Sequence, residues 1–363
     1  MKHLSLSHET ILSVDLNILE NNFQYFKKKL NPNTKIIGVV KAYAYGYGDI
    51  EISKKLEAIG VAALWVSDFE EGIALRSSGI KIPIIVANPG TKSYHYFLKY
   101  QLEPVIYNFE LLNIFADKLH NLNIHVKFNT GMNRYGFNVT DLPQLCLKLK
   151  NATHLKVKSI CSHLAASNNI KRDDFTISQF NKFDTIFNKF AKIHSTKPMR
   201  HILNSSGVLQ FPKMQFDMVR IGIGLYGSCK EPDLMQIGVL KSVVAQIQNV
   251  KKNSFIGYEP SFLTNKDMQV AIIPFGYADG LNRKLGDGEG GVFINNDFCR
   301  IVGKISMDSC LVDITNKNVS VGDKVEIFGE NIKVTAIANQ LNTIPYEILS
   351  VLNRRIKRIY LNE

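Results

Sequence analysis

Hydrophobic positions along the first two-thirds of the chain follow two alternating patterns. Short apolar runs recur, and amphipathic stretches with apolar residues near helical spacing separate them. The runs predict eight strands, at 35–40, 63–67, 82–88, 103–107, 124–129, 156–162, 201–205 and 218–223. The stretches predict helices that include 15–30, 51–59, 69–78, 109–119, 141–150 and 174–193. Eight strands alternating with helices favour an α/β fold, a TIM-like (β/α)₈ barrel, over an open sheet.

The pattern changes after about residue 240. Short apolar runs with turn signals between them predict a mostly β region, with strands at 243–247, 270–275, 291–294, 301–303, 310–314 and 325–328. One late helix is predicted around 332–341, followed by a basic tail at 354–358. We therefore predict two domains, a barrel over residues 11–240 and a β domain over 241–363. The first ten or so residues are expected to pack with the β domain.

Composition narrows the class of protein. With 45% hydrophobic and 21% charged residues among 363, the chain is typical of a soluble globular protein. It has no apolar stretch long enough to span a membrane, and its first ten residues lack the apolar core of a signal peptide. Five scattered cysteines without a CxxC pair favour a reducing cytoplasm and predict no disulfide framework or metal site. The net charge of +12 is spread over helix-like segments, so no nucleic-acid partner is expected.

Distinctive polar residues fall where the predicted barrel strands end, which is where barrels place their chemistry. Lys41 follows the apolar run 35–40, a position that can hold an amine at the rim of a pocket and lower its pKa for Schiff-base chemistry. Ser205 and the amides of Gly222 and Ile223 lie where barrels often bind phosphate. Other polar groups at strand ends are Lys127, Arg134, His163, Asn204 and Arg220. The pattern predicts a lysine that faces a phosphorylated ligand.

Several segments, in order along essentially the whole chain, resemble those of alanine racemases. The barrel half carries Val39-Val40-Lys41-Ala42-Tyr43-Ala44-Tyr45-Gly46, the run from Lys127 to Gly136, Ser162-His163, His201 to Ser205, and Met218 to Gly227. The β half carries Gly276-Tyr277-Ala278-Asp279-Gly280, Ile305-Ser306-Met307-Asp308 and Thr343 to Glu347. The resemblance implies a pyridoxal 5'-phosphate (PLP) enzyme that interconverts L- and D-alanine and supplies D-alanine for peptidoglycan.

The resemblance also implies residue roles. Lys41 would hold PLP and act as one base, and Tyr277, contributed by the other subunit of a homodimer, would act as the opposing base. Arg134 and the Met307 amide would orient the substrate carboxylate. Lys127 matches a lysine that is carbamylated in some family members, and Asp308 would support the site. The residues expected to bind the cofactor are Lys41, Tyr45, His163, Asn204, Ser205, Arg220, Gly222, Ile223 and Tyr346.

Departures from the common family pattern leave these roles in place. Tyr43, Tyr47, Asn129, Ile221 and Ser306 replace other residues without removing a catalytic group. Pro345 is the departure that most affects the expected path of its loop, because it removes a backbone N–H beside Tyr346. A serine or broad-specificity racemase would use the same mechanism. A PLP-binding homeostasis protein without turnover is the other alternative, but such proteins usually lack the β domain.

Overall fold

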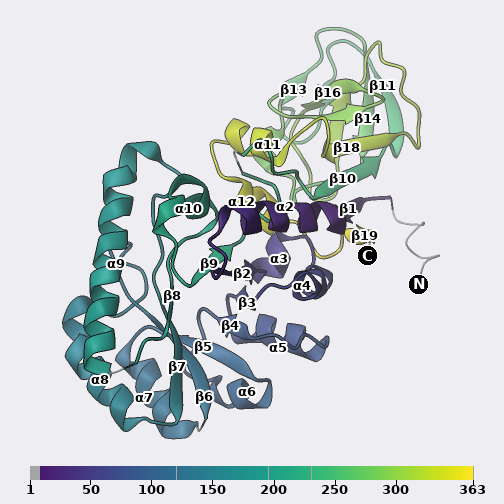
Figure 1. Cartoon of the computed structure of the whole chain (residues 1–363). Coiled ribbons are helices and arrows are strands. Elements are labelled where there is room, and N and C mark those ends of the chain that lie inside the picture. Colours follow the sequence, from purple (N-terminus) through teal and green to yellow (C-terminus); the bar gives the residue numbers. More distant parts are fainter. Residues whose placement is uncertain (1–8, 120, 195, 230, 363) are drawn as a thin grey trace. The chain divides into compact units, whose positions relative to one another are not determined.

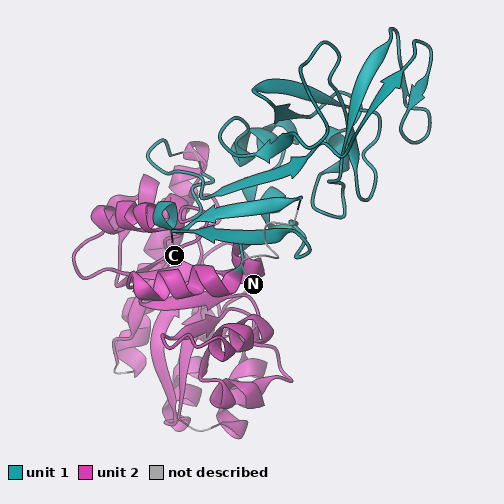
Figure 2. Ribbon diagram, turned by 90° about the vertical axis from the view of Figure 1, so that its right-hand side faces the viewer, with its two compact units in different colours: residues 1–19, 45–48, 226–363 teal, residues 20–44, 49–225 magenta. Residues whose placement is uncertain are grey.

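The chain divides into two compact units that interleave along the sequence. The computed structural model describes residues 9–119, 121–194, 196–229 and 231–362. One unit contains residues 20–44 and 49–225, and the other contains 1–19, 45–48 and 226–363 (Figure 2). The expectation for the first ten residues falls mainly on residues 1–8, which lie outside the described residues. The division at residue 240 stays a prediction.

The unit that contains residues 20–44 and 49–225 is built on a parallel eight-stranded sheet. Its strand order is β8-β7-β6-β5-β4-β3-β2-β9, and the Arg220 N–H donates to the carbonyl of Leu203 (3.0 Å) across the edges that nearly close it into a barrel. The strands are β2 (Lys35–Val39), β3 (Ala63–Val66), β4 (Ile84–Val86), β5 (Leu102–Ile106), β6 (Leu122–Lys127), β7 (Leu155–Cys161), β8 (Met199–His201) and β9 (Met218–Ile221). The predicted barrel is confirmed. Seven predicted strands overlap the observed ones, whereas the strand predicted at 201–205 lies earlier, at Met199–His201.

Helices connect the barrel strands (Figure 1). Those that match predictions are α2 (Leu16–Lys29), α4 (Asp49–Ala58), α5 (Phe69–Ser77), α7 (Phe109–Lys118), α8 (Leu142–Asn151) and α9 (Asp173–His194). Two further helices, α6 (Tyr94–Lys99) and α10 (Ser205–Gln210), are each six residues long, too short for helical periodicity to show. Single turns complete the set: α3 (Lys41–Tyr45), η1 (Val139–Asp141), η2 (Ile170–Arg172) and η3 (Pro212–Met214). A further turn, η4 (Arg283–Leu285), belongs to the other unit.

The other unit is mostly β, as predicted. Its nine-stranded sheet has the order β11-β14-β17-β16-β15-β18-β10-β1-β19 and is antiparallel except where β1 pairs with β19. The strands are β1 (Ile11–Asp15), β10 (Gly238–Val243), β11 (Gln246–Val250), β14 (Met268–Ile273), β15 (Gly291–Ile294), β16 (Asp297–Val302), β17 (Cys310–Asp313), β18 (Lys324–Phe328) and β19 (Lys357–Leu361). A hairpin of β12 (Phe255–Ile256) and β13 (Phe262–Leu263), with helices α11 (Val334–Gln340) and α12 (Pro345–Ser350), completes it.

Two details differ from the predictions. The strand predicted at 243–247 is interrupted at Val244 and Ala245, so that β10 and β11 are separate strands. The predicted basic tail is ordered structure, because β19 joins the sheet and Arg358 is buried within this unit. The Arg358 guanidinium donates to the carbonyl of Gly46 (2.8 and 3.1 Å) and to other backbone carbonyls. Because all five N–H donors of the guanidinium meet carbonyl oxygens, these hydrogen bonds offset the loss of water around the buried cation.

Candidate active site

Lys41 lies directly beyond the carboxyl end of β2 and begins a left-handed turn. Ala42, Tyr43, Ala44 and Tyr45 all have φ between 49° and 57°. Non-glycine residues in this conformation each cost roughly 1–2 kcal/mol. The Glu71 carboxylate contributes to holding the turn: it accepts from the Ala42 N–H and from the Ser67 N–H (2.6 Å each). The turn therefore depends on a residue of α5.

Glu71 was not predicted as part of the site. Burial raises its pKa, an effect that its hydrogen bonds from the Ser67 and Ala42 backbones oppose. The side chain is 29 residues from Ala42 in sequence, and no local pattern marks it. It influences Lys41 in two ways, by bracing the turn that follows and by placing a carboxylate near the amine.

Four cationic side chains gather at the carboxyl ends of the barrel strands. They are Lys41, Lys127, Arg134 and Arg220, which influence one another electrostatically. Burial, and then the charge of Arg134, lowers the pKa of Lys41 from its usual value. Burial, together with the charges of Arg220, Arg134 and Lys41, lowers the pKa of Lys127 to about 8. A cluster of like charges of this kind favours an anionic ligand.

Arg220 is buried on β9 and is held by neighbours on two adjacent elements. Its Nη1 donates to Nδ1 of His201 (2.5 Å), and its Nη2 donates to the Ser162 carbonyl (2.7 Å) and to Nδ1 of His163 (3.0 Å). Because arginine only donates, Nδ1 of His163 carries no proton. Burial and the Arg220 charge lower the pKa of His163 well below its usual range. The predicted residues Arg220 and His163 are thus in direct contact, with the imidazole neutral.

The loop after β6 carries Arg134 and is organised by Asn129. The Asn129 Oδ1 accepts from the Gly131 and Asn133 backbones (3.1 Å each). Arg134 is exposed, and it lines a small pocket together with Lys127, His163 and neighbouring residues. Asparagine at position 129 therefore supports the loop that carries the predicted substrate-binding arginine.

Ser205 begins α10, a short turn after β8, and lies beside the turn that follows β9. Its Oγ accepts from the Gly222 N–H (3.1 Å) and the Gly224 N–H (3.2 Å). Asn204 caps α10 through a bond from the Gly207 N–H to its Oδ1 (2.8 Å). Ser205, Gly222 and the adjoining Ile223 are thus brought together, as predicted from their places in sequence, while the Asn204 side chain is committed to the helix cap.

In the other unit, Tyr45 and Tyr346 lie side by side, with ring centroids 5.7 Å apart. Burial raises the pKa of both phenols, that of Tyr346 to about 12. Both phenols therefore stay protonated near neutral pH and keep a proton to donate. Pro345 begins α12, a position where a helix tolerates a missing backbone N–H. Pro345, the departure expected to affect this loop most, is thus compatible with a regular helix start.

Tyr277 and Met307 lie on two segments of the β unit that are hydrogen-bonded together. The Tyr277 N–H donates to the Ser306 carbonyl (3.1 Å), and the Ala278 N–H donates to the Met307 carbonyl (2.9 Å). A Cβ on Gly276 would come within 2.5 Å of the carbonyl oxygens of both Ser306 and Met307, so only glycine permits this approach. The side chains of Tyr277 and Met307 are 44% and 54% exposed, which leaves them free to meet a ligand or a second chain.

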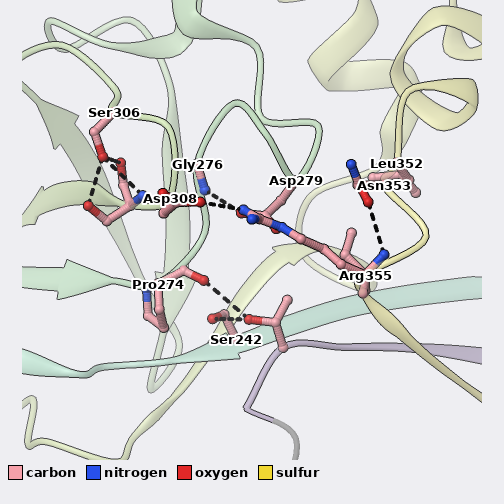
Figure 3. Close-up of polar contacts among 12 residues, drawn as sticks. Ser242, Pro274, Gly276, Asp279, Ser306, Asp308, Leu352, Asn353 and Arg355 are labelled. Atoms are coloured by element: carbon pink, nitrogen blue, oxygen red, sulfur yellow. Dashed lines mark hydrogen bonds and ion pairs between the residues drawn. The ribbon is translucent and has the colours of Figure 1, made fainter.

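Arg355, a residue that sequence reasoning did not select, connects the same two segments. Its Nε donates to Asp279 Oδ1 (2.6 Å), and its Nη2 donates to Asp308 Oδ1 (2.7 Å). The second oxygen of Asp279 accepts from the Gly276 N–H (2.8 Å). Figure 3 shows the guanidinium reaching both carboxylates. Asp308 is thus bonded to Arg355, and its support of the site stays a prediction.

Comparison with known families covers both halves of the chain. A model of the alanine racemase N-terminal domain matches residues 14–230, and a model of the alanine racemase C-terminal domain matches residues 237–360. The chain belongs to the alanine racemase family. The alanine racemase of Treponema denticola is 35% identical, covering 96% of this chain and 97% of its own. That of Methanococcus maripaludis is 33% identical and covers 98% of this chain and 100% of its own.

Solved structures of alanine racemases share the whole fold. That of Bartonella henselae, with covalently bound pyridoxal phosphate, has a TM-score of 0.89 and 28% identity, and the match covers 98% of this chain and 100% of the other. That of Bacillus anthracis, with bound L-Ala-P, has a TM-score of 0.92 and 26% identity over 98% of this chain and 96% of the other. The alanine racemase fold therefore extends over the barrel and the β unit alike.

Proposed function

We infer that this chain is an alanine racemase that uses PLP, and we propose Lys41 and Tyr277 as its two acid–base groups. The family match over both halves of the chain carries the activity. The observation that carries the residue assignment is Lys41, an amine of lowered pKa among the cations Arg134, Arg220 and Lys127. An amine that loses its proton more readily is a better nucleophile toward a carbonyl.

The residues present fit PLP. Lys41 would hold its carbonyl carbon, Arg220 would donate to the ring nitrogen, and His163 and Asn204 would support the surroundings of the ring. The phosphate would be held by Ser205, the amides of Gly222 and Ile223, and the phenols of Tyr45 and Tyr346. The donor set is cationic or neutral throughout, as a phosphorylated ligand requires. When bound, PLP supplies the electron sink for the substrate's α-carbon.

The protein's own groups move the proton. Racemisation removes the α-proton on one face of the substrate and returns a proton to the other. We assign the face of D-alanine to the Lys41 amine and the face of L-alanine to the Tyr277 phenol. Arg134 would pair with the substrate carboxylate and the Met307 N–H would donate to it, which fixes the α-carbon between the two bases. Arg220, which cannot accept a proton, would keep the ring nitrogen unprotonated.

We also propose a homodimer in the cytoplasm, supplying D-alanine for peptidoglycan. The exposed side chains of Tyr277 and Met307 support a site completed by a second copy of the chain. No helix of the described ranges is both long and apolar enough to cross a membrane. Lys127 is proposed to carry a carbamate, which would turn a cation beside Arg134 into an anion that orients it.

The test of the activity is α-proton exchange of L-amino acids in heavy water, followed by NMR and polarimetry with PLP present. Alanine should exchange and lose optical activity faster than serine or lysine. The Lys41→Ala variant should do neither. If serine turned over faster than alanine, serine would be the preferred substrate. If Lys41→Ala still turned over alanine, the role assigned to Lys41 would be wrong.

A further inference from the structure

A continuous chain of buried hydrogen bonds leads from Arg220 to a carboxylate at the other side of the barrel. His201 Nδ1 lies 2.5 Å from Arg220 Nη1, and its Nε2 lies 3.0 Å from Ser159 Oγ. Ser159 Oγ lies 2.6 Å from His125 Nδ1, and His125 Nε2 lies 2.9 Å from Glu103 Oε2. One residue comes from each of β9, β8, β7, β6 and β5. His125, Ser159 and His201 are at most 2% exposed.

The chain runs from the carboxyl ends of the strands toward their amino ends. His201 is the last residue of β8, whereas Glu103 is the second residue of β5. Glu103 lines a surface hollow together with Arg76 and Asn123, so this end of the chain meets solvent. Arg220 and His163 form the other end, at the site. The five side chains therefore connect the site to the opposite rim of the barrel.

Donor chemistry gives the chain one direction. An arginine only donates, so His201 Nδ1 must accept, and the proton of a neutral His201 sits on Nε2. That proton points to Ser159, whose own hydroxyl hydrogen is then available to His125 Nδ1. His125 in turn donates from Nε2 to Glu103. Burial and the Arg220 charge lower the pKa of His201 well below its usual range, which keeps the ring neutral.

The two ends of the hydrogen-bond chain, Arg220 and Glu103, carry opposite charges. Arg220 is buried, and among the residues that the structure describes no carboxylate contacts it. Burial acts to raise the pKa of Glu103, but hydrogen bonds from His125 and Asn123, with the charge of Lys158, outweigh it, so that the pKa lies below its usual value. The other charged or titratable groups that face the chain are Arg76, Lys127, Cys161 and His163. None of these other groups is a carboxylate, so Glu103 is the negative charge of the network.

We propose that Glu103, His125 and Ser159 are positioning residues for Arg220. Through the ordered chain they supply the guanidinium with a remote negative charge and hold it in one orientation toward the cofactor ring. The inference rests on the proposed placement of Arg220 at PLP. In a buried network, each hydrogen bond polarises the next, so a change at Glu103 is transmitted to Arg220. Glu103 thereby tunes the site without touching substrate or cofactor.

The direction of the chain can be observed without measuring activity. The enzyme is labelled with ¹⁵N in its histidine rings, prepared with and without PLP, and assigned with single His→Asn variants. Two-bond NMR correlations between pH 6 and 8 should show His201 neutral, with its proton on Nε2, and His125 donating from Nε2. A proton on Nδ1 of either ring would overturn the proposed order.

The effect on the site is tested with Glu103→Gln. The variant keeps the size of the side chain and an oxygen that can accept from His125, and the Asn123 amide can turn over to meet the new NH₂ group. Losing a negative charge makes the potential at the site more positive, which lowers the pKa of Lys41 further. The pH profile of kcat/KM for alanine should therefore move to lower pH, with thermal unfolding close to wild type.

Ser159→Ala interrupts the chain at its centre. It leaves the Nε2–H of His201 unpaired in the barrel, and kcat should fall about tenfold with little change in KM. The matched control is Asp217→Asn. Asp217 is an exposed carboxylate beside β9 that binds Arg200 and takes no part in the hydrogen-bond chain. It should leave the pH profile unchanged.

The outcomes separate this inference from the proposed function. A wild-type pH profile for Glu103→Gln, in an enzyme that Lys41→Ala inactivates, would overturn the positioning role and leave the racemase assignment in place. Activity retained by Lys41→Ala would overturn the assigned role of Lys41, while the NMR result would still establish or reject the hydrogen-bond order.

Discussion

At the scale of single residues, burial beside other cations sets the chemistry of the site. Lys127 is 9% exposed and shares its surroundings with Arg134, Arg220 and Lys41. A protonated amine is disfavoured both by the loss of water and by its neighbours' charges, and its pKa falls to about 8. Only the neutral amine can add carbon dioxide, so the lowered pKa favours the carbamate proposed for Lys127.

Carbamylation of Lys127 should increase as the pH rises through about 8. At that pH about half of the Lys127 amines are neutral, against about 0.3% for a lysine of pKa 10.5. ¹³C NMR of enzyme equilibrated with ¹³C-labelled bicarbonate should show a carbamate signal that grows between pH 7 and 9. Lys127→Met should lack the signal. Its absence from the wild-type enzyme at pH 9 would exclude the modification.

At the scale of elements, two short segments need support from distant side chains. The left-handed turn after β2 is held by Glu71 of α5, and the segments of Tyr277 and Met307 are held by Arg355. Neither support touches a group that we propose to react. Each instead restricts the backbone that carries such a group, which is how a surrounding shell keeps a site in its productive geometry.

Glu71→Leu should destabilise the protein and impair Lys41 together. The exposed Ala42 N–H and the partly buried Ser67 N–H lose their acceptor, at a cost of about 0.5–1.5 kcal/mol each. Urea unfolding should report the lost stability, and kcat should fall because the turn beside Lys41 is no longer held. Glu70→Leu, the neighbouring acidic residue of α5, is the control and should change neither quantity by a comparable amount. Equal effects of the two substitutions would contradict the bracing role.

Arg355→Met should weaken catalysis while leaving cofactor binding intact. The substitution keeps much of the side-chain length but frees Asp279 and Asp308 from each other, so the positions of Tyr277 and Met307 become less defined. We expect kcat/KM for alanine to fall by about tenfold or more, and PLP absorbance to be retained. Lys357→Met, an exposed change on the neighbouring β19, is the control. Loss of PLP from Arg355→Met would show a wider structural role.

At the scale of the whole molecule, the proposed site needs a second copy of the chain. Tyr277 is assigned to the site of a partner, and its side chain is exposed in the single chain. A closed two-fold dimer would contain two identical sites, each built from Lys41 of one subunit and Tyr277 of the other. Catalysis would then depend on association as well as on folding.

Shared sites predict recovery of activity when two inactive variants are mixed. Lys41→Ala and Tyr277→Phe should each be nearly inactive. A heterodimer of the two has one intact site if Tyr277 acts in the partner's site. With random exchange, half of the dimers are heterodimers, and activity should recover to about a quarter of wild type. No recovery, with heterodimers demonstrated by native mass spectrometry, would place Tyr277 in the site of its own chain.

The prediction of fold from sequence succeeded where the signal was local. Most barrel strands contain a short apolar run, so periodicity located seven of them. It misplaced β8, which holds Arg200 and His201, at 201–205. The segments around Lys41, Tyr277 and Met307 marked the family. The β1 strand, the helices α6, α10 and α12, and the true role of residues 354–358 were missed. These elements are short or lie at edges, and the pairing of β19 with β1 joins residues from opposite ends of the chain.

The sequence by itself determined the order of strands and helices and the family, because periodicity and contiguous motifs are properties of neighbouring residues. Only the tertiary structure decided which distant side chains support the site. Glu71 braces the turn after Lys41, Arg355 joins Asp279 to Asp308, and Glu103 connects to Arg220 through three intervening residues. Such contacts depend on how strands lie beside one another in the folded barrel and sheet, and no spacing along the chain encodes them.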